Sequence, residues 1–137
     1  MPKLRHLALY TADPEATAAF YRGAFDMVEV GRTDSPFAEG IYLSDGTVNV
    51  ACLRYRSREM AAKLGGSSEF GVSHFGFWVE DMDSARKRLQ DLGAQHVETR
   101  DPDAAPTGFF EDKWKGPDGT VFDITDEGWV GAQPPKD

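Results

Sequence analysis

Residues 5–25 read RHLALYTADPEATAAFYRGAF, and residues 73–94 read SHFGFWVEDMDSARKRLQDLGA. Each stretch is a short apolar segment with one histidine, followed by a segment that begins with an acidic residue and is typical of a helix. A shift of 68 residues aligns His6 with His74 and Asp13 with Asp81. Because an internal repeat determines the architecture, we expect two copies of one unit.

The first segment of each copy alternates as a β-strand does. Leu7 and Leu9 fall on one face, and His6 and Tyr10 fall on the other. The second copy places His74 opposite its phenylalanines in the same way. Each histidine is therefore predicted to lie on the face opposite the larger apolar side chains.

A helix is predicted after each of these strands. Asp13 is a good N-cap because it precedes Pro14, and either Asp81 or Asp83 can cap the second helix. Side chains at helical spacing are expected to face the sheet. In the first helix this stripe consists of Ala16, Ala19, Phe20 and Gly23.

Three further extended stretches follow each helix, and Asp-Gly pairs at 45–46 and 118–119 indicate hairpin turns. The predicted fold class is α+β, with two βαβββ modules whose sheets curl around a central cavity. We expect the first module at 1–56, a linker at 57–70, the second module at 71–130 and a tail at 131–137.

Composition limits the classes of function. The chain has 137 residues, 40% of them hydrophobic, which is typical of a globular protein with one compact core. Its net charge of −8 argues against a nucleic-acid partner, and no apolar run approaches the length of a membrane span. The single cysteine, Cys52, suits a reducing compartment, so we expect a cytoplasmic protein.

Residues 120–126 provide a carboxylate that matches the two histidines. Phe122 and Ile124 share one face of this strand, and Asp123 lies on the other. If the aromatic faces pack beneath the helices, Asp123 joins His6 and His74 in the cavity. Two imidazoles and a carboxylate suit Fe²⁺, Mn²⁺ or Zn²⁺. The alternative is that each histidine is an ordinary hydrogen-bonded residue of the core.

The two histidine segments and the closing GPDGTVFDI, residues 116–124, resemble the vicinal oxygen chelate superfamily. That family includes glyoxalase I, methylmalonyl-CoA epimerase, type I extradiol dioxygenases, fosfomycin-resistance thiol transferases and bleomycin-binding proteins. The resemblance covers nearly the whole chain. It implies paired βαβββ modules around a divalent metal, commonly in a homodimer.

The resemblance also implies ligands from the first and last strands of each module. His6 and His74 match the first-strand positions, and Asp123 stands where the family usually has Glu. For the last strand of the first module, the alternation favours Asn49, whereas alignment of the two DGTV stretches favours Val50. Neither residue is a carboxylate. A set of only three protein ligands resembles that of the dioxygenases and thiol transferases of the family.

Other residues are candidates for contact with a small-molecule substrate. We expect Asn49, Tyr10 and Trp78 to bind it, and Glu111 to act as a general base. The alternatives are that Asn49 is a hydrogen-bonded polar residue without contact to substrate and that Glu111 occupies an exposed strand position. Trp129 is expected to pack over one end of the domain with no chemical role. A basic cluster could attract an anionic substrate or form a solvated linker; it consists of Arg54, Arg56, Arg58 and Lys63.

These observations predict a metal-dependent enzyme that acts on a small substrate with vicinal oxygens. The first choice of cation is Fe²⁺, with Mn²⁺, Zn²⁺ or Ni²⁺ as alternatives, and the first choice of reaction is dioxygenase-type ring cleavage. A glyoxalase- or epimerase-like lyase or isomerase is the second hypothesis. A metal-free drug- or metabolite-binding resistance protein is the third.

Overall fold

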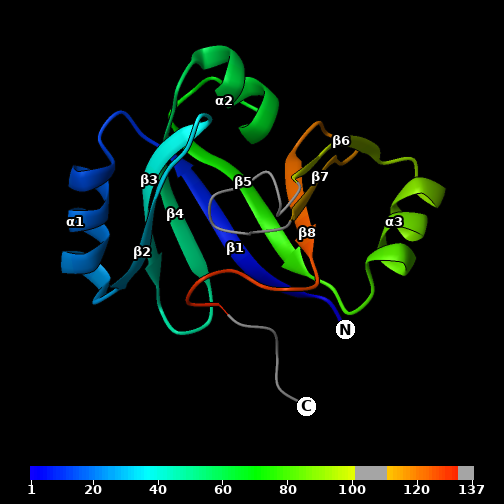
Figure 1. Ribbon diagram of the computed structural model, residues 1–137, viewed down its shortest axis with the longest axis horizontal. Helices are drawn as coiled ribbons and strands as arrows, with labels where there is room; N and C mark the ends of the chain where they lie inside the picture. Colours follow the sequence, from blue (N-terminus) through cyan, green and yellow to red (C-terminus); the bar gives the residue numbers. More distant parts are fainter. Residues whose placement is uncertain (101–110, 133–137) are drawn as a thin grey trace.

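The computed structural model describes residues 1–100 and 111–132, and these form eight strands and three helices (Figure 1). The strands of the first half are β1 Lys3–Tyr10, β2 Val28–Asp34, β3 Ala38–Ser44 and β4 Asn49–Tyr55. Those of the second half are β5 Gly71–Trp78, β6 Gln95–Arg100, β7 Glu111–Lys115 and β8 Val121–Thr125. The helices are α1 Pro14–Phe25, α2 Arg58–Gly65 and α3 Met82–Asp91.

All eight strands form one sheet, in the order β2-β3-β4-β1-β5-β8-β7-β6. β1 and β5 pair antiparallel at the centre, β4 runs parallel to β1, and β8 runs parallel to β5. The same order of strands therefore extends outward on each side. The predicted pair of βαβββ modules is confirmed, and we call β1–β4 with α1 the first module and β5–β8 with α3 the second.

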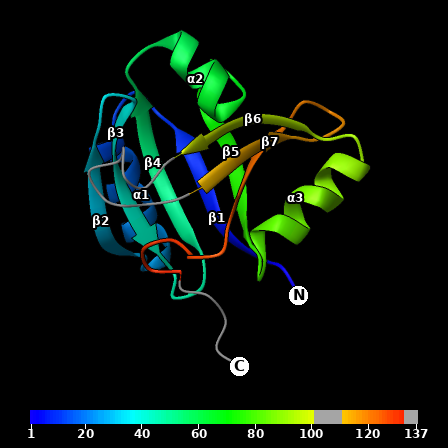
Figure 2. The same cartoon turned by 45° about the vertical axis from the view of Figure 1, so that its right-hand side comes forward.

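The two modules turn toward each other, so that the sheet curls around a central space (Figure 2). α1 lies beside β2–β4 and α3 beside the second module, both on the outside of the curl (Figures 1 and 2). Histidine strands β1 and β5 are thereby placed at the bottom of this space. The fold thus places the two histidine strands side by side in the sheet, with His6 paired to Gly76 and His74 paired to Ala8.

Both predicted N-caps are present. Asp13 accepts a hydrogen bond from the Ala16 amide, and Asp81 accepts from the amide of Ser84. The predicted stripe of α1 was wrong, however, because Phe20 is 63% exposed and Ala18 is buried. The helix turns Ala18 toward β3 and β4, which rotates Phe20 away from the sheet.

The segment expected as a linker contains helix α2. Ser57 caps its first turn by accepting from the Met60 amide, and Gly66 ends it in the left-handed conformation at φ 81°. Ala61 and Leu64 are buried in the same apolar cluster as Tyr10. α2 therefore closes one end of the space between the modules.

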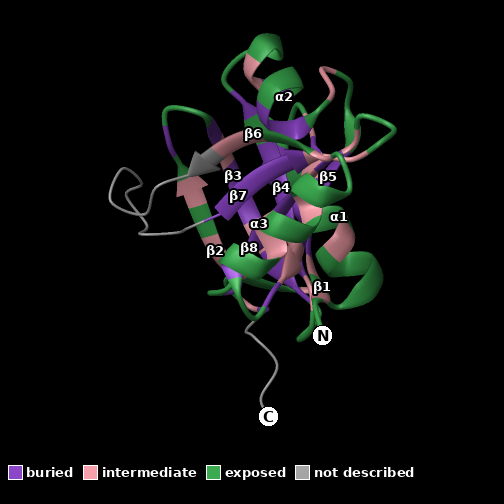
Figure 3. Cartoon of the chain, turned by 90° about the vertical axis from the view of Figure 1, so that its right-hand side faces the viewer, coloured by how far each residue is buried: buried purple, intermediate pink, exposed green. Residues whose placement is uncertain are grey.

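Burial is greatest on the inner face of the sheet and beneath the helices (Figure 3). β1 shows the predicted alternation, since His6, Ala8 and Tyr10 are buried, whereas Leu7 and Leu9 are only half-buried. Cys52 lies on the opposite face under α1, and burial raises the pKa of its thiol to about 11. Within residues 1–100 and 111–132, no helix is both long and apolar enough to cross a membrane.

Candidate metal centre

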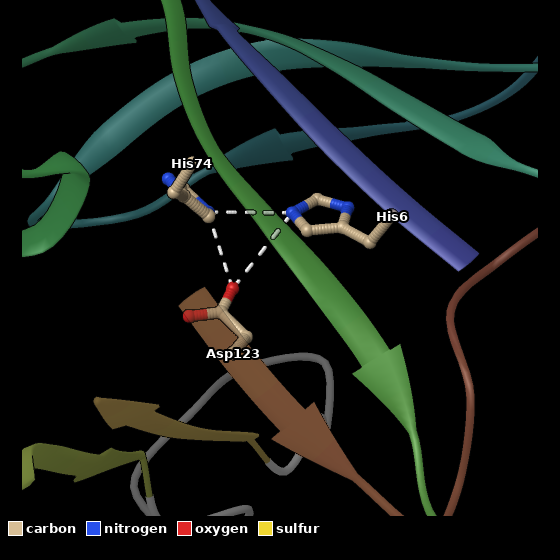
Figure 4. Close-up of side chains that lie close together, drawn as sticks. All are labelled: His6, His74 and Asp123. Atoms are coloured by element: carbon tan, nitrogen blue, oxygen red, sulfur yellow. Dashed lines mark hydrogen bonds and ion pairs between the residues drawn. The ribbon is translucent and has the colours of Figure 1, made fainter. Parts of the chain in front are cut away.

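Three side chains from neighbouring strands meet at the centre of the curled sheet (Figure 4). His6 comes from β1, His74 from β5 and Asp123 from β8. The two imidazole Nε2 atoms are 3.3 Å apart, and Asp123 Oδ2 lies 3.1 Å from Nε2 of His74 and 3.8 Å from Nε2 of His6. All three side chains are buried. The structure thus brings together the three residues proposed from the sequence as ligands.

His6 is held by an amide and by an indole. Asn49 Nδ2 donates to the Val130 carbonyl at 2.8 Å, so Asn49 Oδ1 faces His6 Nδ1 as an acceptor at 2.7 Å. We infer that Nδ1 carries the proton and that Nε2 offers a lone pair. The ring of Trp129 stacks on the imidazole with centroids 5.0 Å apart and planes 5° apart.

His74 is held in a corresponding way. Ser73 Oγ lies 3.0 Å from His74 Nδ1 and donates its own proton to the Gly65 carbonyl. The serine oxygen is therefore an acceptor for Nδ1–H, which again leaves the lone pair on Nε2. The Tyr55 hydroxyl is 3.4 Å from the same Nδ1. Each imidazole thus has a polar partner from its own module and an aromatic neighbour from the other half of the chain.

The two carboxylate oxygens of Asp123 have different neighbours: Oδ1 faces Lys113, and Oδ2 faces the two histidines. Lys113 Nζ donates to Oδ1 at 2.8 Å. Oδ2 is buried and accepts no hydrogen bond of good geometry from the described residues. Burial alone would raise the pKa of Asp123, but Lys113 and the two histidines hold it below its usual range.

The donor atoms fit a divalent cation. With both protons on Nδ1, as inferred above, two imidazole lone pairs and a carboxylate oxygen point toward one another, an arrangement that a cation among them would stabilise. Burial lowers the pKa of both imidazoles, and the charge of Asp123 offsets only part of that shift. The rings are consequently neutral near pH 7, which is the form that binds metal.

A second carboxyl group faces the same cavity. Glu111 is 5% exposed, and its Oε1 lies 3.4 Å from Lys113 Nζ. Burial and the charge of Asp123 raise the pKa of Glu111. Burial opposes the charge of Lys113, but Asp123 and Glu111 more than compensate and raise its pKa. Glu111 is thus buried rather than in an exposed strand position, and it faces the cavity together with Lys113.

The fourth ligand position of the family pattern is occupied by Ala51. Asp123 pairs with Gly76 in β5, and the matching residue Ala8 in β1 pairs with Ala51 in β4. Neither candidate from the sequence, Asn49 nor Val50, stands there. The reason is that the first module has one residue more between its Asp-Gly turn and this position.

A cavity of about 330 Å³ opens beside the donor set. Its charged side is formed by His6, His74, Glu111 and Lys113. Much of the remaining lining comes from the first module and α2. The first module contributes the polar side chains of Arg32, Thr33, Ser35 and Asn49, and we call the apolar members of this lining the apolar wall. These are Phe37, Ala38, Tyr42, Ala51, Leu53 and Leu64.

The three expected substrate contacts have different positions. Asn49 lines the cavity, but its amide already bonds His6 and Val130. Tyr10 packs against Tyr55 in the core, four residues along β1 from His6. Trp78 Nε1 donates to the Asp126 carbonyl at the far end of β5. Neither Tyr10 nor Trp78 lines the cavity, so the structure gives no support to substrate contact at these two positions.

Sequence reasoning missed Lys113, Ser73, Tyr55 and the role of Trp129. Lys113 had a usable signal, because it alternates with Glu111 on a strand next to that of Asp123. No local sequence pattern indicated the role of Trp129. It lies after the last strand, β8, and its contact with His6 is formed only when the distant parts of the chain pack together. Its ring fills the space beside Gly76, where an added Cβ would lie 2.6 Å from the indole.

Comparisons with known proteins identify the family and the fold. The family model described as the Glyoxalase/Bleomycin resistance protein/Dioxygenase superfamily matches residues 3–124. No curated protein gives a significant match.

Several solved structures share the fold. A hypothetical protein of Bacillus halodurans C-125 is 17% identical with a TM-score of 0.72, and the match covers 90% of this chain and 92% of that one. A methylmalonyl-CoA epimerase in complex with methylmalonyl-CoA and NH4+ is 17% identical with a TM-score of 0.73, over 90% and 93%. A single-residue variant of the Streptomyces coelicolor methylmalonyl-CoA epimerase, in complex with 2-nitronate-propionyl-CoA, is 18% identical with a TM-score of 0.71, over 89% and 94%.

Proposed function

Because the chain belongs to the Glyoxalase/Bleomycin resistance protein/Dioxygenase superfamily, we propose that it is a metal-dependent isomerase or lyase that moves a proton on a small substrate with vicinal oxygens. His6, His74 and Asp123 would hold the divalent cation. Bound there, the cation would act as a Lewis acid on two neighbouring substrate oxygens. The likeness in fold to methylmalonyl-CoA epimerases supports this reaction class.

The observation that carries the proposal is the buried carboxyl of Glu111 in the same cavity. A general base works best when its pKa is near the working pH, and burial moves the pKa of Glu111 in that direction. Glu111 takes the proton from a carbon next to a substrate carbonyl. Lys113 lies 3.4 Å from Glu111 and 2.8 Å from Asp123, so it fixes both carboxylates in place.

The remaining parts of the proposal concern the cation and the assembly. Fe²⁺ is our first choice, and Mn²⁺, Zn²⁺ and Ni²⁺ also suit a set of two imidazoles and a carboxylate. We propose a homodimer, as is common in the superfamily, located in the cytoplasm. The single, buried Cys52 is compatible with a reducing compartment.

Fe²⁺-dependent ring cleavage is the second candidate. Ala51 at the fourth ligand position favours it, because a set of two histidines and one carboxylate leaves several positions open on the cation. The third candidate, a metal-free binding protein, predicts no stoichiometric uptake of metal.

The test begins with anaerobic loading by Fe²⁺ or Mn²⁺ and metal analysis, where one equivalent is expected. Transfer of solvent deuterium into small α-hydroxyketones and hemithioacetals is then followed by NMR. Glu111→Gln should lower the exchange rate by about 10²–10⁴-fold while the metal remains bound. Glu98→Gln, a half-buried residue of β6 outside the cavity, is the control and should exchange normally.

Other results would redirect the proposal. Oxygen uptake with a panel of catechols, without deuterium exchange, supports the dioxygenase. Metal content below about a tenth of an equivalent after loading supports the binding protein.

A further inference from the structure

Equivalent positions of the two modules present different side chains to the cavity, although His6, Arg32, Thr33 and Ser35 of the first module also line it. In the second module, Asp123 and Lys113 are paired across β8 and β7. At the equivalent place in the first module, Ala51 and Tyr42 are paired across β4 and β3. An ion pair on one side therefore corresponds to a methyl group and a phenol on the other.

We infer that the apolar wall of the first module binds an uncharged, flat, phenyl-sized body of the substrate, while the vicinal oxygens face the second module. This inference rests on the proposed function and names its substrate class. The absence of a side chain beyond Cβ at Ala51 leaves room for this body where a fourth ligand would otherwise stand. Ala38 and Leu53 continue the same surface.

The cationic side chains near the cavity are already paired with carboxylates, which is consistent with an uncharged substrate body. Arg32 lines the cavity, but its guanidinium pairs with Glu15 and Glu29. The basic cluster proposed from the sequence is likewise neutralised within the described chain. Its pairs are Arg54 with Glu39, Arg56 with Asp34 and Glu39, Arg58 with Glu69, and Lys63 with Glu98.

The size of the cavity favours a small molecule over a large carrier thioester. A volume of about 330 Å³ is at the lower end of the range of about 300–1,000 Å³ for ligand pockets. A phosphate-bearing carrier would also need cations that are not already paired. Substrate selection therefore comes from shape and apolar contact on the first-module side.

Two hydroxamates test the inference, because both chelate through vicinal oxygens and differ only in the body. Their dissociation constants are measured by calorimetry on Mn²⁺-loaded protein. Benzohydroxamate should bind at least about tenfold more tightly than acetohydroxamate, since only its phenyl group reaches the wall. Equal affinities would overturn the inference.

Substitution at the wall locates the effect. Ala51→Leu should weaken benzohydroxamate by about tenfold and change acetohydroxamate by less than about threefold, with the Mn²⁺ dissociation constant unchanged. Val50→Leu, on the opposite face of β4, is the matched control and should alter none of these values. Equal weakening of both hydroxamates by Ala51→Leu would contradict the assignment.

A metal-free arm separates this inference from the proposed function. Benzamide is titrated into protein with ¹³C-labelled alanine methyl groups, without any metal. The Ala51 and Ala38 methyl signals should shift through the ring current, and Ala18, on the buried face of α1, should not. If the protein binds no metal but Ala51 shifts, the proposed function fails and the wall remains. If Ala51 and Ala18 respond alike, the wall fails whatever the metal result.

Discussion

Strand β4 of the first module and strand β8 of the second lie at equivalent places beside the two histidine strands, yet they present different side chains to the cavity. β8 carries Asp123, and one of its carboxylate oxygens accepts a hydrogen bond from Lys113. β4 offers Ala51, which leaves open space. The histidine strands retained the same chemistry after duplication, whereas their neighbours diverged. A duplicated fold can thus keep one shared function at its axis and assign separate functions to its two sides.

The largest effect is expected from removal of the charge that distinguishes β8. Asp123→Asn should abolish metal uptake and lower the free energy of unfolding by about 3–5 kcal/mol, because Lys113 remains buried without its main partner. Adding Lys113→Met should restore part of the stability but none of the metal binding. Denaturant titration and metal analysis measure both.

The control for this comparison is Asp118→Asn in the exposed turn before β8, which should cost less than about 1 kcal/mol. Stoichiometric metal in Asp123→Asn would mean that Asp123 is not a ligand.

A smaller effect tests whether the two histidines are equivalent. Burial lowers both pKa values below the unfolded value of 6.5, so the unfolded chain binds more protons than the folded one below that pH. The stability of the metal-free protein should therefore fall as pH drops below about 6.5, by up to about 1.4 kcal/mol per pH unit for each histidine. Unfolding by urea between pH 7.5 and 5 measures this slope.

His6→Gln and His74→Gln should each remove about half of that slope. Glu111, whose pKa is raised by burial, contributes with the opposite sign, and because the charge of His74 also affects that pKa, His6→Gln gives the more direct measure of one imidazole. Exposed His96→Gln is the control. A variant with the full wild-type slope would show that its histidine is not buried in the neutral form.

The smallest effect concerns the support that His6 receives from the other half of the chain. Trp129→Leu should weaken Mn²⁺ binding by about tenfold. This is the smallest loss expected when a residue that orients a metal ligand is removed, because Trp129 contacts His6 by ring stacking and not by a hydrogen bond. Trp129→Phe should retain most of the affinity. Calorimetry and the ¹⁵N signals of His6 report the change.

Trp114→Phe, a buried indole that contacts His96 instead, is the control for this variant. Unaltered Mn²⁺ affinity and His6 signals in Trp129→Leu would show that the stack does not orient the imidazole.

Most of the fold could be predicted from the sequence because it depends on local patterns that occur twice. The alternation around His6 and His74, the caps Asp13 and Asp81, and the two Asp-Gly turns all have short-range physical causes. The α1 stripe was wrong for a different reason. Spacing gives the period of a helix, but the rotation that buries Ala18 and exposes Phe20 is set by the strands beneath it.

The metal-ligand candidates could also be predicted from local patterns, but other parts of the site could not. Face patterns identified His6, His74 and Asp123, since a strand alternates reliably. Alignment of the DGTV stretches pointed to Val50 instead of Ala51 because the first module has one additional residue after its turn. Alternation identified the correct face of β4 but favoured Asn49, two positions earlier on that face. Helix α2 was missed although Ser57 and Gly66 could have marked its ends, because eight residues give too short a period to read.

Gly76 has a consequence for anyone comparing or redesigning chains of this kind. Its backbone is ordinary, so torsion angles would suggest that alanine is acceptable, but a single methyl group there would occupy the place of the indole. The added methyl group would also lie 3.1 Å from the Cβ atom of His6, so the constraint at position 76 comes from both neighbours. A library that varies position 76 alone should recover almost only glycine, whereas a smaller ring at position 129 removes the contact with the indole.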